Sequence, residues 1–440
     1  MGALANDPIL LGVSAIALVL IISALGVPIA VSLTAVAGLG MWLSGGFNYV
    51  SVNFETLPFD SIANYSFAVI PMFVLMGAFA TEAGIVTDLF TALNRFAERT
   101  RGGLYLATTA ASAGFAAISG STVVNAAVFT RMALPEMIEH GYDKRISAGL
   151  IAAAGTFAAL IPPSLTFVVI GILTGESIGA LFIAGIVPGL LTAAAYLVVI
   201  PVLVRFRPDW APAPVGTSTL RERVAGLRTV WPMILLVLIV LGGIYSGLTS
   251  PTSAGAVGAA GALIIALALR RISRRQIWQS FKHTAELTSV IFFIVVGGLL
   301  FSRFLASSGF VGELISMVTQ VGMSGPVFLL AIIVMYFILG MFIDSMSMLV
   351  VTLPFVFPIM ISFGYNPLWF GVVVTKLMEI AVITPPFGLN LFTVVSASER
   401  RISAAEMMVG VLPFVILEIV ILAILILLPV LSTWLPSTMY

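Results

Sequence analysis

Apolar runs long enough to cross a lipid bilayer recur along the whole chain. Of its 440 residues, 60% are apolar and 9% are charged. A helix of about 20 apolar residues spans the hydrocarbon. Inside it every backbone N–H and C=O needs a partner, which favours helices. We therefore predict an all-α polytopic membrane protein with crossings at about 9–26, 29–44, 65–82, 146–171, 179–204, 231–249, 253–269, 286–304, 367–395 and 404–432.

The composition excludes several classes of protein. The absence of cysteine excludes disulfides, iron–sulfur clusters and thiolate metal sites, and two histidines make metal-dependent catalysis a poor prospect. A formal net charge of +1 gives no basic field for nucleic acid. The first apolar run has no basic residues before it and is too long for the core of a cleavable signal peptide.

Two further apolar stretches are each interrupted near the middle. The stretch 103–138 contains "SGS" at Ser119–Ser121, and 326–362 contains "GMFIDS" at Gly340–Ser345. The arms on either side are short for a full span, so we predict re-entrant hairpins whose tips stop part-way through the bilayer. Two short complete helices joined by a tight turn are the alternative.

The basic residues predict the orientation of the chain. Arginines and one lysine cluster in the segments 205–229 and 270–282, whereas the loops near Glu176 and Tyr365 carry almost none. By the positive-inside rule, the basic segments are cytoplasmic and the loops near Glu176 and Tyr365 lie outside.

An internal repeat appears when the chain is shifted so that residue 162 falls on residue 385. The same shift aligns Pro28 with Pro251, Pro135 with Pro358, Gly141-Tyr142 with Gly364-Tyr365, and Glu176 with Glu399. We predict two repeats, 1–215 and 231–440, joined by a cytoplasmic linker at 216–230. Each holds about five crossings and one hairpin, and an odd number of crossings inverts the second copy. Inverted repeats with broken helices are typical of secondary transporters; a structural repeat without transport is the alternative.

Paired prolines interrupt the predicted helices 146–171 and 367–395. Proline has no N–H for the carbonyl four residues earlier, so Pro162-Pro163 would release the carbonyls of Ala158 and Ala159, and Pro385-Pro386 those of Ala381 and Val382. Freed oxygens in hydrocarbon are costly unless something polar fills the break. The hairpin tips add further oxygens from Ser119, Ser121, Asp344, Ser345 and Ser347. We predict paired cation sites; packed kinks with capping serines are the bland alternative.

The remaining polar positions predict an anion site. The half-helices that start at Ser164 and at Gly388 point N–H groups and a positive dipole end toward the breaks, which suits a carboxylate. The predicted substrate contacts are Asn125, Ser164, Gly388, Asn390 and Arg303, although snorkelling to the interface also explains Arg303. Lys376 and Glu379 are spaced to neutralise each other, with a proton relay as the alternative. Asp344 has no basic neighbour in its motif and is the strongest single candidate for a cation ligand.

These motifs also resemble a known family. The segments "AISGSTVVNAA", "GYDKRISAGLIAAAGT", "IPPSLTFVVIG", "GIYSGLTSPTSAGAVGA", "LGMFIDSM" and "EIAVITPPFGLNLF" are similar to the large membrane subunit of tripartite ATP-independent periplasmic (TRAP) transporters, the DctM-like group. The resemblance implies a sodium-driven, elevator-type importer of organic acids in the bacterial inner membrane. Its moving transport domain would consist of the hairpins and broken helices, and its scaffold of the other helices. The implied partners are a small four-helix membrane subunit and a periplasmic substrate-binding protein.

The resemblance also implies two Na⁺ sites. The first would use Ser119, Ser121 and carbonyls around Ala158, Ile161 and Pro163. The second would use Asp344, Ser345 and carbonyls around Ala381, Thr384 and Pro386.

The chain departs from the family pattern in two places. Ala158 stands where the family often has glycine, and Pro251-Thr252-Ser253 where many members read P-T-E, so no role of that glutamate transfers. The chain begins close to its first crossing, so we expect the small subunit to be a separate polypeptide. A stand-alone sodium/carboxylate symporter, a channel and an intramembrane protease are alternatives, and the sequence lacks HExxH and paired intramembrane aspartates for the last.

Overall fold

The computed structural model describes residues 7–214, 218–386 and 388–439, and within them the secondary structure is entirely helical. The α-helices are α2 (Pro8–Ala24), α3 (Ile29–Ala63), α4 (Val69–Glu82), α5 (Ile85–Ala97), α6 (Gly103–Ser119), α7 (Thr122–Glu139), α8 (Lys144–Gly155), α9 (Phe157–Leu160), α10 (Leu165–Thr174), α11 (Ile178–Phe206), α12 (Leu220–Leu227), α13 (Trp231–Tyr245), α14 (Pro251–Ala268), α15 (Arg274–Ser307), α16 (Phe310–Gln320), α17 (Gly325–Gly340), α18 (Ser345–Ser362), α19 (Pro367–Ile383), α20 (Leu389–Ala397), α21 (Ala404–Leu427) and α22 (Val430–Ser437). Short 3₁₀ turns cover Tyr65–Ala68, Pro208–Trp210 and Arg228–Val230.

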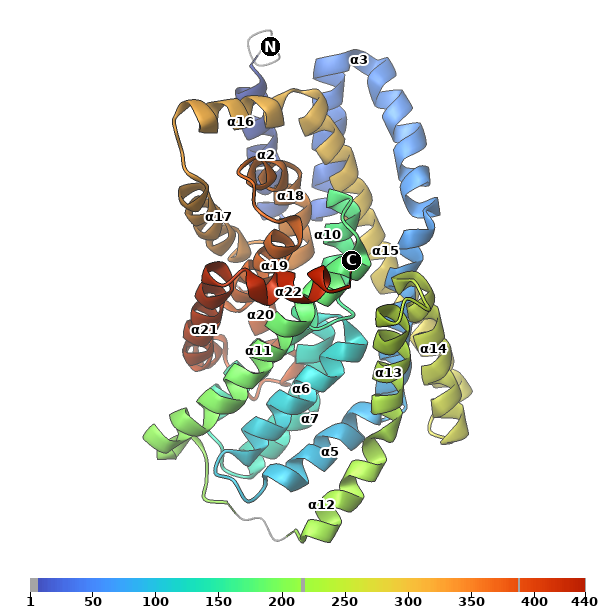
Figure 1. Cartoon of the computed structure of the whole chain (residues 1–440), viewed down its shortest axis with the longest axis vertical. Helices are drawn as coiled ribbons and strands as arrows, with labels where there is room; N and C mark the ends of the chain where they lie inside the picture. The colour runs from blue at the N-terminus through green and yellow to red at the C-terminus, as the bar shows by residue number, and fades with distance from the viewer. Residues whose placement is uncertain (1–6, 215–217, 387, 440) are drawn as a thin grey trace.

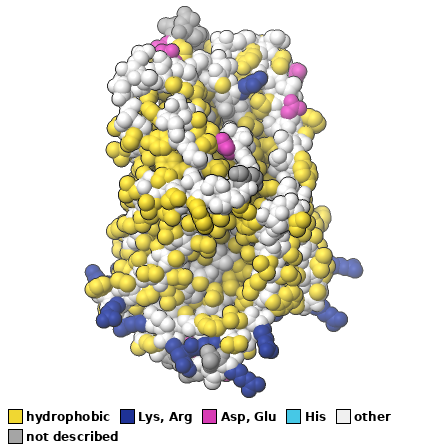
Figure 2. Space-filling model, viewed as in Figure 1, with side chains coloured by type: hydrophobic (Ala, Val, Ile, Leu, Met, Phe, Trp, Pro, Cys, Tyr) yellow, Lys and Arg dark blue, Asp and Glu magenta, His cyan; other side chains and the backbone are white. Residues whose placement is uncertain are grey.

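Many of these helices have the length and composition of membrane spans. Within the described residues, eight helices pass that test, or nine when a bent pair is taken as one span. Figure 2 shows a predominantly apolar surface along most of the molecule, with Lys and Arg side chains gathered at its lower end. That end carries α12, which belongs to the arginine-rich segment predicted to be cytoplasmic (Figure 1). The prediction of an all-helical polytopic protein is confirmed.

Three helix boundaries differ from the sequence prediction. The crossing expected at 29–44 continues in α3 to Ala63, with a break in direction at Gly46, whose φ of 75° only glycine adopts easily. Figure 1 shows the two legs of α3 side by side, joined at the top. The crossing expected from 286 begins at Arg274, where Ser273 and Gln276 form a capping box. The last crossing ends at Leu427, before Pro429.

Several helix contacts occur twice, once in each half of the chain. Helix α3 contacts α2 and α15, and α14 contacts α13 and α4. Helix α8 packs against α21, and α19 against α11. The backbones of α8 and α21 nearly touch at Gly149 and Gly410, which have no side chain to hold the two helices apart. A methyl group on either glycine would overlap a backbone carbonyl of the facing helix. Most of these partners are related by the same shift that aligns residue 162 with residue 385.

The predicted hairpins and broken helices each appear as consecutive helices joined by a short break. The stretch 103–138 forms α6 and α7, and 326–362 forms α17 and α18. Each half-helix that follows a break packs against the hairpin of the other half of the chain, α10 against α18 and α20 against α7. That the hairpin tips stop inside the bilayer stays a prediction.

Candidate ion and substrate site

The first broken helix is interrupted at its proline pair. The axis turns by 43° between Lys144–Leu160 and Leu165–Thr174. Ile161 and Ser164 have extended backbone, and the bond between Pro162 and Pro163 is cis. Every residue from 146 to 171 is buried, so the break lies wholly inside the protein.

A side chain within the first break donates a hydrogen bond to one of the carbonyls that the prolines release. The Ser164 hydroxyl donates a hydrogen bond to the Ala159 carbonyl and accepts one from the Phe167 N–H at 3.3 Å. Ser164 therefore caps α10 and also replaces the donor that proline removes. The expectation that the Ala159 carbonyl is left open for a cation is wrong. Ala158, the predicted ligand, is fully buried beside it.

The first hairpin tip lies directly on this break. The Leu165 N–H donates to the Gly120 carbonyl at 3.2 Å, and a methyl group on Gly120 would lie 2.7 Å from the Pro163 carbonyl oxygen. Next to Gly120, the Ser119 hydroxyl is buried and has no hydrogen-bond partner within the described residues. Ser121 caps α7 through the Val124 N–H at 3.5 Å. An unpartnered buried hydroxyl at this point is an available oxygen ligand.

The second break repeats this plan with different side chains. Helix α19 ends at Ile383, Thr384 is extended, and the bond between Pro385 and Pro386 is cis. The position equivalent to Ser164, residue 387, lies outside the described residues. A methyl group on Gly388 would overlap the Val382 carbonyl, so the start of α20 is held against an oxygen that the prolines release. The Thr384 hydroxyl donates to the Ile380 carbonyl at 2.6 Å.

Asp344 lies at the second hairpin tip and caps helix α18. Its carboxylate accepts hydrogen bonds from the N–H groups of Met346 and Ser347, at 3.0 and 3.1 Å, and from the Ser347 hydroxyl. No ion pair in the described part of the chain involves Asp344. Gly340, at the end of α17, meets Ala381 so closely that a methyl group there would clash. This end of the hairpin therefore packs on Ala381, one of the predicted ligands, and Ser345 begins the helix beside Asp344.

The other predicted substrate contacts are held differently. Asn125 is fully buried; its Oδ1 accepts from the Ser112 hydroxyl at 2.9 Å and its Nδ2 donates to the Ser112 carbonyl at 3.1 Å. Asn390 Nδ2 donates to the Ala152 carbonyl at 3.3 Å, and its Oδ1 is buried without a partner among the described residues. Arg303 lies exposed on α15, a helix that packs against hairpin helix α18. The structure thus brings Asn390 to the first half of the chain, whereas Arg303 is exposed on a helix that belongs to neither broken helix.

The sequence prediction missed the residues that surround the buried Lys376–Glu379 pair. The pair itself is confirmed, with Nζ and Oε2 at 2.8 Å. Lys376 also contacts Glu418 of α21, which accepts a hydrogen bond from the Tyr196 hydroxyl of α11. Glu418 is the only ionisable residue beyond the first turn of a helix of mean hydropathy 3.0, and that was the available signal.

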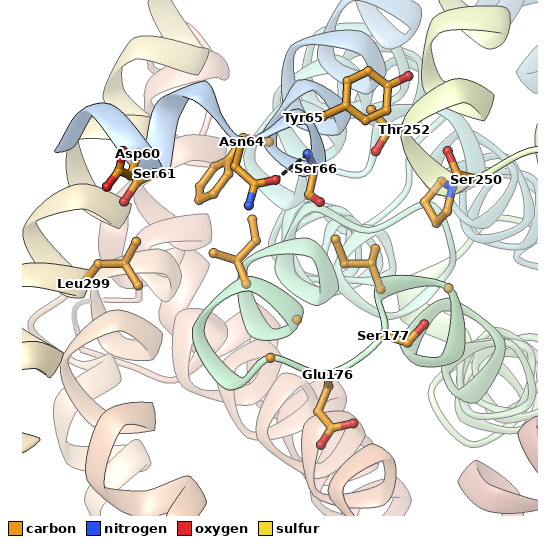
Figure 3. A pocket seen from close by; sticks show the side chains of 17 residues that line it. Asp60, Ser61, Asn64, Tyr65, Ser66, Glu176, Ser177, Ser250, Thr252 and Leu299 are labelled. Atoms are coloured by element: carbon orange, nitrogen blue, oxygen red, sulfur yellow. Dashed lines mark hydrogen bonds between the residues drawn. The ribbon is translucent and has the colours of Figure 1, made fainter. Parts of the chain in front are cut away.

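A cleft of about 670 Å³ opens near the ends of several helices (Figure 3). Asp60, Asn64 and Thr252 line it from α3, the turn after it and α14, while Glu176 and Ser177 line it from the α10–α11 connection. Since the loop near Glu176 is predicted to lie outside, this cleft would face the periplasm.

Comparison with known proteins decides the family. The sequence model for "Tripartite ATP-independent periplasmic transporter, DctM component" matches residues 16–431. The chain belongs to this family. A C4-dicarboxylate TRAP transporter large permease protein from Pseudomonas aeruginosa is 35% identical, with 86% of this chain and 88% of that protein covered. An ectoine TRAP transporter large permease from Halomonas elongata is 31% identical, with 93% and 95% covered.

Solved structures share the fold at greater distance. The DctM-family chain matches the YdaH transporter of Alcanivorax borkumensis with a TM-score of 0.62 at 15% identity, covering 98% of each chain. Its bacterial relatives and its many apolar helices make it a multi-pass protein of the bacterial inner membrane. The relatives are named as transporter permeases, as the resemblance implied.

The hydrogen bond from Ser164 to the first break predicts a stability effect. Ser164→Ala leaves the Ala159 carbonyl buried without its donor, and we expect a loss of about 1–3 kcal/mol in the free energy of unfolding. Thermal unfolding of the purified protein in detergent measures it. The control is Ser289→Ala, which also removes a hydroxyl bonded to a backbone carbonyl, that of Ala285 in α15, but at an exposed position. Equal unfolding temperatures for the two variants would contradict the role given to Ser164.

Proposed function

We propose that this DctM-family chain imports an organic acid across the bacterial inner membrane, driven by co-transported Na⁺. The observation that carries the proposal is the Ser119 hydroxyl, which is buried beside the first broken helix and has no hydrogen-bond partner among the described residues. In the second half of the chain, the Asp344 carboxylate lies at the equivalent hairpin tip beside the second break. Oxygen ligands of this kind suit a hard cation such as Na⁺.

Each hairpin tip and the break beneath it would form one sodium site. The first combines Ser119 and Ser121 with carbonyls around Ala158, Ile161 and Pro163. The second combines Asp344 and Ser345 with carbonyls around Ala381, Thr384 and Pro386. The contacts of Gly120 with Pro163 and of Gly340 with Ala381 support this pairing. Among the described residues no group of three His, Cys, Asp or Glu side chains could hold a metal. These sites need no such group, because carbonyls, hydroxyls and, in the second site, the single Asp344 carboxylate would supply the oxygens.

The organic acid would bind between the two half-helices. Both α10 and α20 begin at a break, and the N–H groups and dipole of such a start favour an anion. Gly388 and Asn390 lie at the start of α20. The relatives' names include C4-dicarboxylate, sialic acid, ectoine and isethionate. The first three substrates carry a carboxylate and isethionate carries a sulfonate, so an organic acid anion is the shared chemistry. A periplasmic binding protein would deliver it, and a small membrane subunit would complete the transporter.

Transport would proceed by sliding one block of helices against another. The paired contacts of α3 with α15 and of α4 with α14, and the cross-packing of α10 and α20 on the opposite hairpins, support two inverted repeats. The sequence prediction assigns only hairpins and broken helices to the moving block. We now add α11 and α21 to it, because Lys376 of α19 is bound to Glu418 of α21 and Thr192 of α11. Moving α19 apart from α11 and α21 would leave buried charges without their partners, at a cost of about 3–5 kcal/mol.

Asp344→Asn tests the second sodium site, because asparagine keeps the helix cap but removes the charge. We expect the sodium concentration for half-maximal uptake to rise by about tenfold or more, which corresponds to about 1.4 kcal/mol of lost binding. The measurement is uptake of candidate carboxylates into proteoliposomes that contain the transporter, its small subunit and its binding protein, under an inward sodium gradient.

The matched control is Asp7→Asn. Asp7 caps α2 with the same two backbone hydrogen bonds but lies far from both breaks in sequence and on the exposed end of its helix. A sodium dependence equal to wild type in Asp344→Asn would rule out the second site as proposed.

Cross-linking tests the sliding movement. The chain has no cysteine, so an introduced pair is unique. Ser177, at the start of α11 in the moving block, and Thr252, on α14 in the scaffold, both line the cleft. In the double variant Ser177→Cys with Thr252→Cys, a short bis-maleimide that joins the two cysteines should abolish uptake. Asn64→Cys with Ser250→Cys lies within the scaffold, and its cross-linking should leave uptake intact. Full uptake after complete cross-linking of the first pair would contradict the movement.

A further inference from the structure

Helix α12 and the turn after it present a stripe of four residues on their outer face. Arg221, Val224, Ala225 and Arg228 follow the i, i+3, i+4, i+7 spacing that places side chains on one side of a helix. All four are exposed, and together they line a surface hollow of about 470 Å³. The opposite face of α12 packs on α5, where Gly226 is buried. The stripe is therefore the free side of a helix that is held in place by its other side.

The two arginines of this stripe have no partner in the described part of the chain. Neither Arg221 nor Arg228 forms an ion pair or a hydrogen bond there. The adjacent carboxylate, Glu222, caps α12 and accepts from the N–H and the hydroxyl of Thr219 at 2.6 and 2.9 Å. Arg223, on the inner face, donates to a neighbouring serine hydroxyl at 3.2 Å. The outer stripe thus carries two positive charges that the described residues do not neutralise.

The stripe lies where a membrane-spanning helix enters the bilayer. The segment Arg221–Tyr245 has the length and hydropathy of a span, and Trp231 at the start of α13 is exposed. Exposed tryptophans favour the boundary between headgroups and hydrocarbon. Arg228 precedes this tryptophan by about 4.5 Å of helix. Figure 1 shows α12 running obliquely away from α13, at the end of the molecule where basic side chains gather in Figure 2. Long arginine side chains therefore reach the level of the lipid phosphates.

A ligand that fills this hollow needs both a negative charge and an apolar part. The arginines are about 10 Å apart along the helix axis, and a guanidinium binds phosphate oxygens through paired N–H groups. Val224 between them is 51% exposed, and Leu227 beside it is 45% exposed. A soluble anion would leave these apolar side chains in water, whereas the glycerol and acyl chains of a phospholipid cover them. We propose that the stripe binds the phosphate headgroup of an anionic phospholipid in the cytoplasmic leaflet.

This site is separate from the proposed ion and substrate sites. Helix α12 packs on α5 and leads into α13, which both belong to the part of the chain assigned to the scaffold. The lipid holds the cytoplasmic end of the scaffold at the level of the headgroups while the moving block slides. The inference therefore does not rest on sodium coupling or on the identity of the substrate.

Native mass spectrometry of the full-length chain tests the proposal, with the chain released from nanodiscs of phosphatidylcholine that contain a minor fraction of phosphatidylglycerol. We expect wild type to retain phosphatidylglycerol in preference to phosphatidylcholine. Arg221→Gln combined with Arg228→Gln should weaken this binding by about 30-fold, since each arginine near the membrane surface contributes about fivefold. Val224→Glu places a carboxylate in the hollow and should also abolish retention. The changed side chains are exposed, so all variants should keep the unfolding temperature of wild type.

The matched control is Arg274→Gln with Arg275→Gln. These two arginines begin α15, are exposed, form no ion pair in the described part of the chain, and are predicted to lie on the same side of the membrane. Their removal should leave lipid retention unchanged. Equal loss from both double variants would overturn the site, because basic segments in general would then attract the lipid. Displacement of the lipid by inorganic phosphate or by added small subunit would also overturn it, since the hollow would then serve a soluble anion or a protein.

Discussion

A backbone carbonyl that loses its helical donor inside an apolar bundle must find another partner, and the centre of this structure is built around that requirement. Both proline pairs create such carbonyls. At the first break, the Ser164 hydroxyl satisfies one of them and the hairpin tip at Gly120 packs on the next turn of chain. At the second, Gly388 brings α20 onto the Val382 carbonyl. The oxygens left over are the ones available to an ion.

The arrangement of the helices follows from the same breaks. A half-helix cannot bury its exposed start alone, and each one packs on a hairpin from the other half of the chain. Close glycine contacts between α8 and α21 hold these elements against their neighbours. The cluster of Lys376, Glu379 and Glu418 adds a polar tie that makes α11, α19 and α21 one unit.

The parts of this structure that the sequence predicted are those with local causes. Proline pairs and the "SGS" and "GMFIDS" turns interrupt helices wherever they occur, so the breaks and hairpin arms could be located within a few residues. Features that depend on distant residues could not be predicted. The bond from Ser164 to Ala159 depends on how the chain turns at the break, and the meeting of Lys376 with Glu418 and Tyr196 requires three helices to pack. The second leg of α3 carries too many polar residues to read as a crossing.

The central claim is that the hairpin tips and breaks bind sodium, and amide hydrogen exchange in sodium against potassium at equal ionic strength tests it most directly. Bound Na⁺ would tie the tips to the breaks. We predict slower exchange in sodium at residues 119–124, 161–167 and 341–347, with unchanged exchange in α14. Equal exchange at both tips in the two salts would contradict the account.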